Sequence, residues 1–136
     1  MKLLKSFAVC LFLVLATQNT VAQTYRFKAT SFSLVEKNED GTWGKWTEPE
    51  ESTVVITLDG KKDRIVIGSK ELQVYKIMSY GEKIVSGDDE TIPLNCMMLD
   101  GRACTILIIT RKSQGNRKQF YVNFEDVKFV YNVYVN

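Results

Sequence analysis

Histidine is absent from the 136-residue sequence. Its absence removes the commonest general base, the usual Ser and Cys catalytic triads and the commonest zinc ligand. Most hydrolase mechanisms need one of these groups. We therefore expect no catalytic residues, no metal site and no cofactor, and we expect that the protein is not an enzyme.

Proline and linker-like sequence are scarce as well. The chain has two prolines, Pro49 and Pro93, and no Ser-rich or Gly-rich stretch that would mark a boundary between domains. A chain of this length suits one domain with one hydrophobic core. We predict a single domain over residues 23–136.

Neither positive nor negative charge is in excess after residue 22. Lys2 and Lys5 are the only charged residues before that point, so the 18 basic residues fall to 16, which equals the number of acidic residues. Proteins that bind nucleic acid neutralise several phosphates with clustered Lys and Arg. The balance argues against a nucleic-acid partner, and the local basic run around "SQGN" is typical of a solvated hairpin end.

The N-terminus has the pattern of an export signal. Two lysines precede an apolar run over residues 7–16, and a short polar segment ends in small residues before Gln23. The apolar run is shorter than the roughly 20 residues that cross a bilayer, which argues against a permanent membrane span. We predict a signal-peptide helix in residues 1–22, cleavage after Ala22, and a secreted or periplasmic protein.

Apolar and polar side chains alternate along most of the remaining chain, which predicts strands. In "FYVNF", Phe120, Val122 and Phe124 share one face. In "VKFVYNVYV", Phe129 and Tyr131 share a face with the valines that follow them. Seven further segments alternate in the same way: residues 24–36, 53–58, 63–69, 71–80, 82–86, 92–99 and 104–112.

Short connections containing Gly, Asp or Asn separate these segments. Because parallel strands need crossovers of about a dozen residues or more, such connections predict sequential antiparallel pairing. The predicted fold is all-β: an antiparallel meander of eight to nine short strands that forms a closed or nearly closed barrel. A two-sheet β-sandwich is the alternative.

Two cysteines, Cys96 and Cys104, flank a turn in the predicted domain. An even number of cysteines in an exported chain predicts a disulfide. A three-residue connection over residues 99–101, with Gly101 in the left-handed conformation, places the two cysteines directly opposite each other. We therefore expect this bulged turn and a cross-strand disulfide that acts as a structural staple.

The segment "DGTWGKWTEPEE" holds both tryptophans, Trp43 and Trp46. Exposed indoles stack on sugar rings or fill a pocket of a partner protein, because each presents a large rigid apolar face with one hydrogen-bond donor. The alternative is that both rings fold inward and plug one end of the barrel.

The predicted barrel interior suggests a function. An eight-stranded barrel is wide enough to hold one small molecule, or to be filled by side chains alone. The principal hypothesis is a non-catalytic binding domain for a small apolar ligand, with Phe120, Phe124 and Tyr131 among the contacts. One rival is a cell-surface module that binds a protein or glycan through Trp43 and Trp46 or through a sheet edge. The other is a histidine-free carboxylate enzyme that uses acids of the predicted turns: Glu48, Glu50, Glu51, Asp88, Asp89 and Glu90.

The export signal, the meander of short strands, the "GTW" and "DRIVI" segments and the aromatic final strand resemble small secreted β-barrel proteins of gut bacteria, some of them calycin-like or lipocalin-like. This resemblance implies a barrel. In lipocalins the Gly-x-Trp motif opens the first strand, whereas Gly41, Thr42 and Trp43 follow an earlier strand here. The resemblance therefore assigns no ligand and no site residues.

Overall fold

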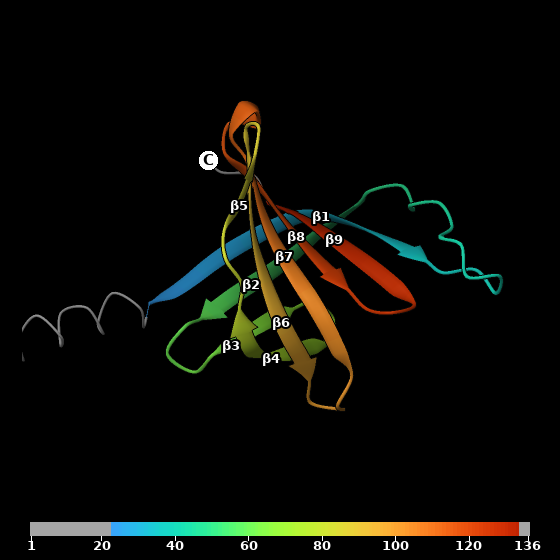
Figure 1. The fold of residues 1–136 in the computed structure, drawn as a ribbon, viewed down its shortest axis with the longest axis horizontal. Coiled ribbons are helices and arrows are strands. Elements are labelled where there is room, and N and C mark those ends of the chain that lie inside the picture. Colours follow the sequence, from blue (N-terminus) through green and yellow to red (C-terminus); the bar gives the residue numbers. More distant parts are fainter. Residues whose placement is uncertain (1–22, 134–136) are drawn as a thin grey trace, which may run out of the picture.

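The structure, a computed structural model, describes residues 23–133, and these residues form an antiparallel β-barrel (Figure 1). The elements are β1 (Thr24–Glu36), β2 (Glu50–Asp59), β3 (Arg64–Gly68), β4 (Leu72–Tyr80), β5 (Ile84–Ser86), β6 (Asp89–Met98), β7 (Ala103–Arg111), the 3-10 turn η1 (Lys112–Gln114), β8 (Arg117–Asn123) and β9 (Val127–Val133). The predicted signal peptide and its cleavage site lie outside the described residues. Within residues 23–133, none of the helical structure has the length and apolar character needed to span a bilayer.

Eight strands close into a ring. The strand order is β4-β3-β2-β1-β9-β8-β7-β6-β5, and an additional pairing between β4 and β6 joins the two sides of the sheet. β5 remains outside the ring as an extra strand. The predicted meander and barrel are confirmed, and the closed ring excludes the two-sheet sandwich.

β6 pairs with two different strands on one of its edges. Its first residues pair with β5, whereas Leu94–Met98 pair with β4. Pro93 lies between the two pairings, and the backbone N–H of Gly81 donates to its carbonyl at 2.8 Å. Since proline has no N–H of its own, the ladder is interrupted there, and β5 departs from the ring at this residue.

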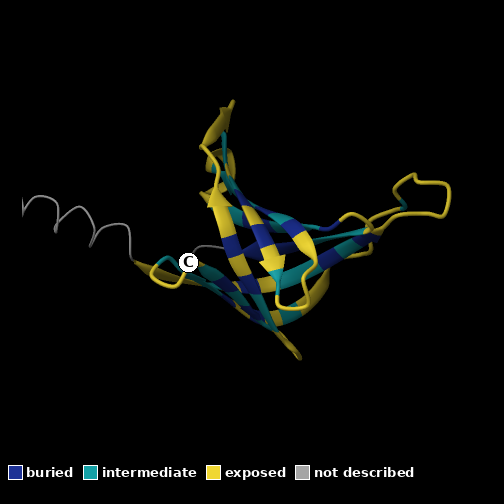
Figure 2. Cartoon of the chain, turned by 60° about the horizontal axis from the view of Figure 1, so that its bottom comes forward, coloured by how far each residue is buried: buried dark blue, intermediate teal, exposed yellow. Residues whose placement is uncertain are grey.

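The core of the molecule is the inside of the barrel. Figure 2 shows buried and exposed residues alternating along the strands, as expected when one face of a curled sheet is covered. Phe120 and Val122 have no exposed surface, and Phe124, Tyr131 and Val133 are also buried. The predicted inner face of these last two strands is therefore confirmed.

A β-bulge shapes the first strand. The pairing of β1 shifts between Ala29 and Ser31. Thr30 is an extra residue relative to β9, where the partners of Ala29 and Ser31 are consecutive, whereas relative to β2 the extra residue lies in β2. Ala29 and Phe32 consequently face the interior although they are three residues apart. Strict alternation would have turned Phe32 outward.

The β6–β7 hairpin confirms the predicted turn but not the disulfide. Gly101 has φ +91°, and Cys96 lies directly opposite Cys104. Both thiols are free and buried, so the expected disulfide is wrong. The N–H of Met98 donates to the carbonyl of Arg102, so these two residues form a hydrogen-bonded pair of the antiparallel ladder. Hydrogen-bonded and non-hydrogen-bonded pairs alternate along the two strands, so Cys96 and Cys104, two residues further from the turn, also form a hydrogen-bonded pair. In such pairs the Cβ atoms stand about 5.5 Å apart, beyond the roughly 3.5–4.5 Å that a disulfide needs.

Candidate functional site

The candidate site is a pocket of about 510 Å3 at one end of the barrel. It lies where the strands β1 and β9, the start of β2 and the β3–β4 turn meet. Its lining consists of Phe32, Glu50, Glu51, Ser52, Val54, Ser69, Lys70, Gln73, Phe129 and Tyr131. We call it the mouth pocket.

Aromatic rings form the inner wall of the mouth pocket. The bulge in β1 turns Phe32 inward, where its ring centroid lies 6.3 Å from that of Tyr131. Phe129 comes from the same face of β9, two residues before Tyr131, and meets Phe124 edge-on at 6.4 Å. The wall therefore offers a continuous apolar surface to an occupant of the pocket.

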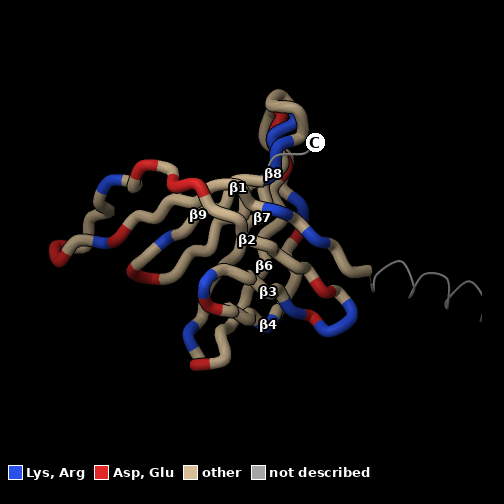
Figure 3. The backbone as a smooth tube through the Cα atoms, turned by 180° about the vertical axis from the view of Figure 1, so that it is seen from behind, with Lys and Arg blue, Asp and Glu red and all other residues tan. Residues whose placement is uncertain are grey.

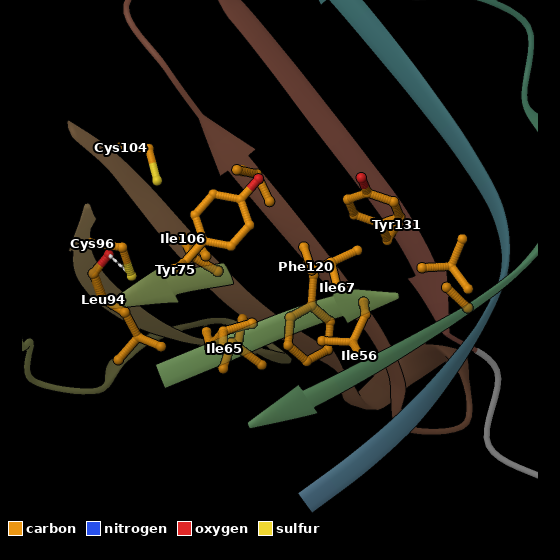
Figure 4. Close-up of a cluster of buried hydrophobic side chains, with 14 of the residues drawn as sticks. Ile56, Ile65, Ile67, Tyr75, Leu94, Cys96, Cys104, Ile106, Phe120 and Tyr131 are labelled. Carbon is orange, nitrogen blue, oxygen red and sulfur yellow. Dashed lines mark hydrogen bonds between the residues drawn. The ribbon is translucent and has the colours of Figure 1, made fainter. Parts of the chain in front are cut away.

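A fixed hydrogen-bonding group lies within this wall. The hydroxyl of Tyr75 donates to Oε1 of Gln73 at 2.6 Å. The Gln73 side chain also lies beside the hydroxyl of Tyr131, where it partly offsets the effect of burial on that group. Burial is the larger effect and raises the pKa of Tyr131 above its usual 10.0. In Figure 4 both tyrosine hydroxyls point toward the same side of the core.

The rim of the mouth pocket is polar. Glu50 pairs with Phe32 across the strands, which places it on the inner side, and Glu51 follows it. Lys70 and Ser69 approach from the β3–β4 turn. An apolar wall with a charged, solvated rim is the usual composition of a small-molecule site.

The predicted interior contacts divide into two groups. Tyr131 lines the mouth pocket. Phe120 and Phe124 instead belong to the packed core: the Phe120 ring lies 5.1 Å from that of Phe27, and the Phe124 ring lies 6.4 Å from that of Tyr75. A ligand at the mouth therefore meets Tyr131 directly and these two phenylalanines only through their neighbours.

Sequence reasoning missed Phe32 and Gln73 as parts of the site, and it named Glu50 only as an acid of a possible carboxylate enzyme. Gln73 had a visible signal, because it stands two residues before Tyr75 in a segment that alternates strictly. Phe32 and Glu50 had none, because the bulge that turns Phe32 inward also places Glu50 opposite it.

The two tryptophans lie outside the barrel, so the interpretation that they plug one end is wrong. The β1–β2 loop runs beside β1, held by the N–H of Thr47 on the carbonyl of Leu34 at 2.9 Å. Trp46 meets Tyr121 of the outer face edge-on at 6.1 Å, and Trp43 lies under the ammonium group of Lys128 at 4.3 Å. Trp43 is 36% exposed and Trp46 45% exposed.

The acids near β5 take part in ion pairs. Asp89 pairs with Arg111, while Glu90 lies 3.0 Å from Lys83 and 2.7 Å from Lys112. Hydrogen bonds from both lysines lower the pKa of Glu90. Figure 3 shows these opposite charges close together on the projecting hairpins, so part of the basic run is neutralised locally.

Within residues 23–133, no three side chains of the His, Cys, Asp or Glu type gather in a way that could hold a metal ion. Comparisons of the chain with protein-family models, with curated proteins and with solved structures give no match. The mouth pocket is therefore the feature from which a function can be inferred.

Proposed function

We propose that the protein is an exported, non-catalytic binding domain that holds a small apolar molecule in the mouth pocket. The observation that carries this proposal is the aromatic wall of Phe32, Phe129 and Tyr131 around a space of about 510 Å3. Ligand pockets in proteins typically measure about 300–1,000 Å3 and combine an apolar lining with a few placed polar groups.

The rest of the interior supports a site at the mouth rather than deep in the barrel. Ile56, Ile67 and Phe120 have no exposed surface and pack together below the pocket. Close packing of this kind leaves no room for a second molecule. The bound molecule thus lies against the wall, with one end toward the polar rim.

The hydroxyl of Tyr131 indicates which polar group the ligand carries. Tyr131 lines the mouth pocket, and its hydroxyl can donate one hydrogen bond to an occupant. A carbonyl, ether or hydroxyl oxygen on the ligand would accept it. We therefore propose an apolar body that bears a hydrogen-bond acceptor.

Two measurements test this function. Native mass spectrometry of the protein purified from its source cells should show a stoichiometric small-molecule adduct. Titration with the neutral probe Nile red, which has a carbonyl acceptor, should give saturable fluorescence enhancement at one site. A bare mass together with no saturable enhancement would refute the proposal.

Matched variants locate the site. Phe129→Ala should weaken Nile red binding at least tenfold, because it removes part of the wall, and Tyr131→Phe should weaken it about fivefold, because one hydrogen bond contributes about 1 kcal/mol. Tyr80→Phe is the control, since Tyr80 lines a smaller pocket with Leu58 and Tyr25. An equal effect of Tyr80→Phe would place the probe elsewhere.

A surface interaction module is the second candidate, favoured by the exposed indoles of Trp43 and Trp46. Trp46 reaches across the outer face and meets Tyr121 edge-on, so this contact holds the indole in place while Trp46 stays 45% exposed. An exposed indole offers a large rigid apolar face on which a sugar ring can stack. Calorimetric titration with cello-, xylo- and chito-oligosaccharides tests this candidate: binding that is lost in Trp46→Ala supports it, and no heat from any sugar counts against it.

A further inference from the structure

The two thiols that form no disulfide stand side by side in the barrel. Cys96 of β6 and Cys104 of β7 are direct cross-strand partners, and both side chains are buried in the core. Figure 4 shows them on neighbouring strands, both turned toward the interior beside Tyr75. Their hydrogen-bonded register holds the Cβ atoms too far apart for a sulfur–sulfur bond but leaves two sulfurs facing one region.

A third sulfur belongs to the same face. Met98 follows Cys96 by two residues on β6, pairs with Tyr75 of β4 and packs against the core. Met97, between them, points outward and is 38% exposed. The inner face of this hairpin therefore presents two thiols and one thioether.

A positive charge lies next to these sulfurs. A terminal nitrogen of Arg102 approaches Sδ of Met98 at 3.3 Å, and its guanidinium group stands 5.0 Å from the ring centroid of Phe124. Arg102 also pairs with Asp100 at 2.9 Å, which fixes its position at the end of the hairpin.

We propose that Cys96, Cys104 and Met98 form a binding site for Cu(I). Thiolate and thioether ligands are soft and select this ion, whereas hard cations need oxygen ligands. Structural zinc sites need four ligands, usually from Cys and His, and the chain has no histidine. Cu(I) is satisfied by two or three sulfurs, and an ion between two thiolates spans a distance that a disulfide cannot.

Binding involves no change of oxidation state. Two S–H groups lose their protons, two S–Cu bonds form, and two protons are released to solvent. The resulting bis-thiolate complex carries one negative charge, which the neighbouring Arg102 compensates.

The test uses the full chain with Cys10→Ser, which leaves Cys96 and Cys104 as its only thiols. Under anaerobic conditions this protein should withdraw one equivalent of Cu(I) from its bicinchoninate complex. X-ray absorption at the copper edge should show sulfur neighbours and no nitrogen or oxygen neighbours. The proposal is overturned if the protein does not withdraw Cu(I) from bicinchoninate, or if the absorption spectrum shows nitrogen or oxygen neighbours around the copper.

Substitutions then assign the ligands. Cys96→Ser or Cys104→Ser should reduce the affinity for Cu(I) at least a hundredfold, and Met98→Leu should reduce it about tenfold. Met97→Leu, on the outer face of the same strand, should leave it unchanged. Full-strength one-to-one binding in a folded Cys96→Ser/Cys104→Ser protein would place the copper elsewhere and refute the site. Nile red binding at the mouth pocket, measured in parallel, reports on the proposed function separately.

Discussion

The side-chain amide of Gln119 donates a hydrogen bond of 2.9 Å to Oδ1 of Asn132 on the outer face of the barrel. This bond is part of a chain that crosses four strands. Nε of Arg111 donates to Gln119 at 3.0 Å, and Nδ2 of Asn132 donates to Oγ of Ser31 at 3.0 Å. The chain therefore supports the seam between β1 and β9, the first and last strands of the described barrel.

Gln119→Ala should lower the free energy of unfolding by about 1–3 kcal/mol, because it leaves the buried Oδ1 of Asn132 without its donor. Gln114→Ala, in the exposed η1 turn, is the matched control and should change stability by less than about 0.5 kcal/mol. Urea denaturation measures both. Equal effects of the two substitutions would show that this chain of side-chain hydrogen bonds contributes nothing to the stability of the fold.

Gly101→Ala should destabilise the protein by about 1 kcal/mol, because Gly101 has φ +91° and a Cβ atom is strained there. Gly68→Ala is the control: a Cβ at Gly68 meets the carbonyl of Val55 at an ordinary 3.5 Å. We expect Gly68→Ala to be neutral or slightly stabilising. Thermal unfolding of both variants checks this, and a neutral Gly101→Ala would contradict the bulged turn.

Two free thiols should appear when the non-reduced chain with Cys10→Ser is unfolded in denaturant and titrated with a thiol reagent. The physical reason is the hydrogen-bonded register of Cys96 and Cys104, which separates their Cβ atoms beyond disulfide reach. In the native protein the same thiols should react slowly because both are buried. If no thiols react after unfolding, the two cysteines form a disulfide and this prediction is wrong.

Stability should fall as the pH rises above about 10. Burial raises the pKa of Tyr75 and of Tyr131 above the ordinary 10.0. The folded state therefore binds these protons more tightly than the unfolded state, so the contribution is complete below pH 10 and is lost as the pH rises toward the higher folded values. Tyr131→Phe should flatten this alkaline decline, as measured by urea midpoints at successive pH values, and an unchanged slope would contradict the assignment.

Acrylamide should quench the tryptophan fluorescence readily, because Trp43 and Trp46 lie on the outside of the barrel. The chain has no other tryptophan, so Trp46→Phe isolates Trp43 and Trp43→Phe isolates Trp46. Trp46 should be the more accessible of the two, since Lys37 and Lys128 both approach the ring of Trp43. Blue-shifted emission that resists quenching in both variants would show that both indoles are buried inside the barrel, and would contradict this prediction.

Part of the candidate site could be read from the sequence. Tyr131 and Phe129 were assigned to the inner face from alternation alone, and both line the mouth pocket. Phe32 and Glu50 join them because of the β1 bulge. A bulge depends on how two distant segments pair, so local alternation carries no trace of it.

Alternation and short turns determined the strands, their antiparallel order and the inner faces of β8 and β9, because both are local properties of a few consecutive residues. Tertiary structure alone decided that β4 pairs with β6, that β5 stays outside the ring, and that Trp46 crosses the outer face to Tyr121. It also decided the hydrogen-bonded geometry that keeps the Cys96 and Cys104 thiols apart. Each of these outcomes depends on twist, register and contacts between residues far apart in the chain, which only the closed barrel brings together.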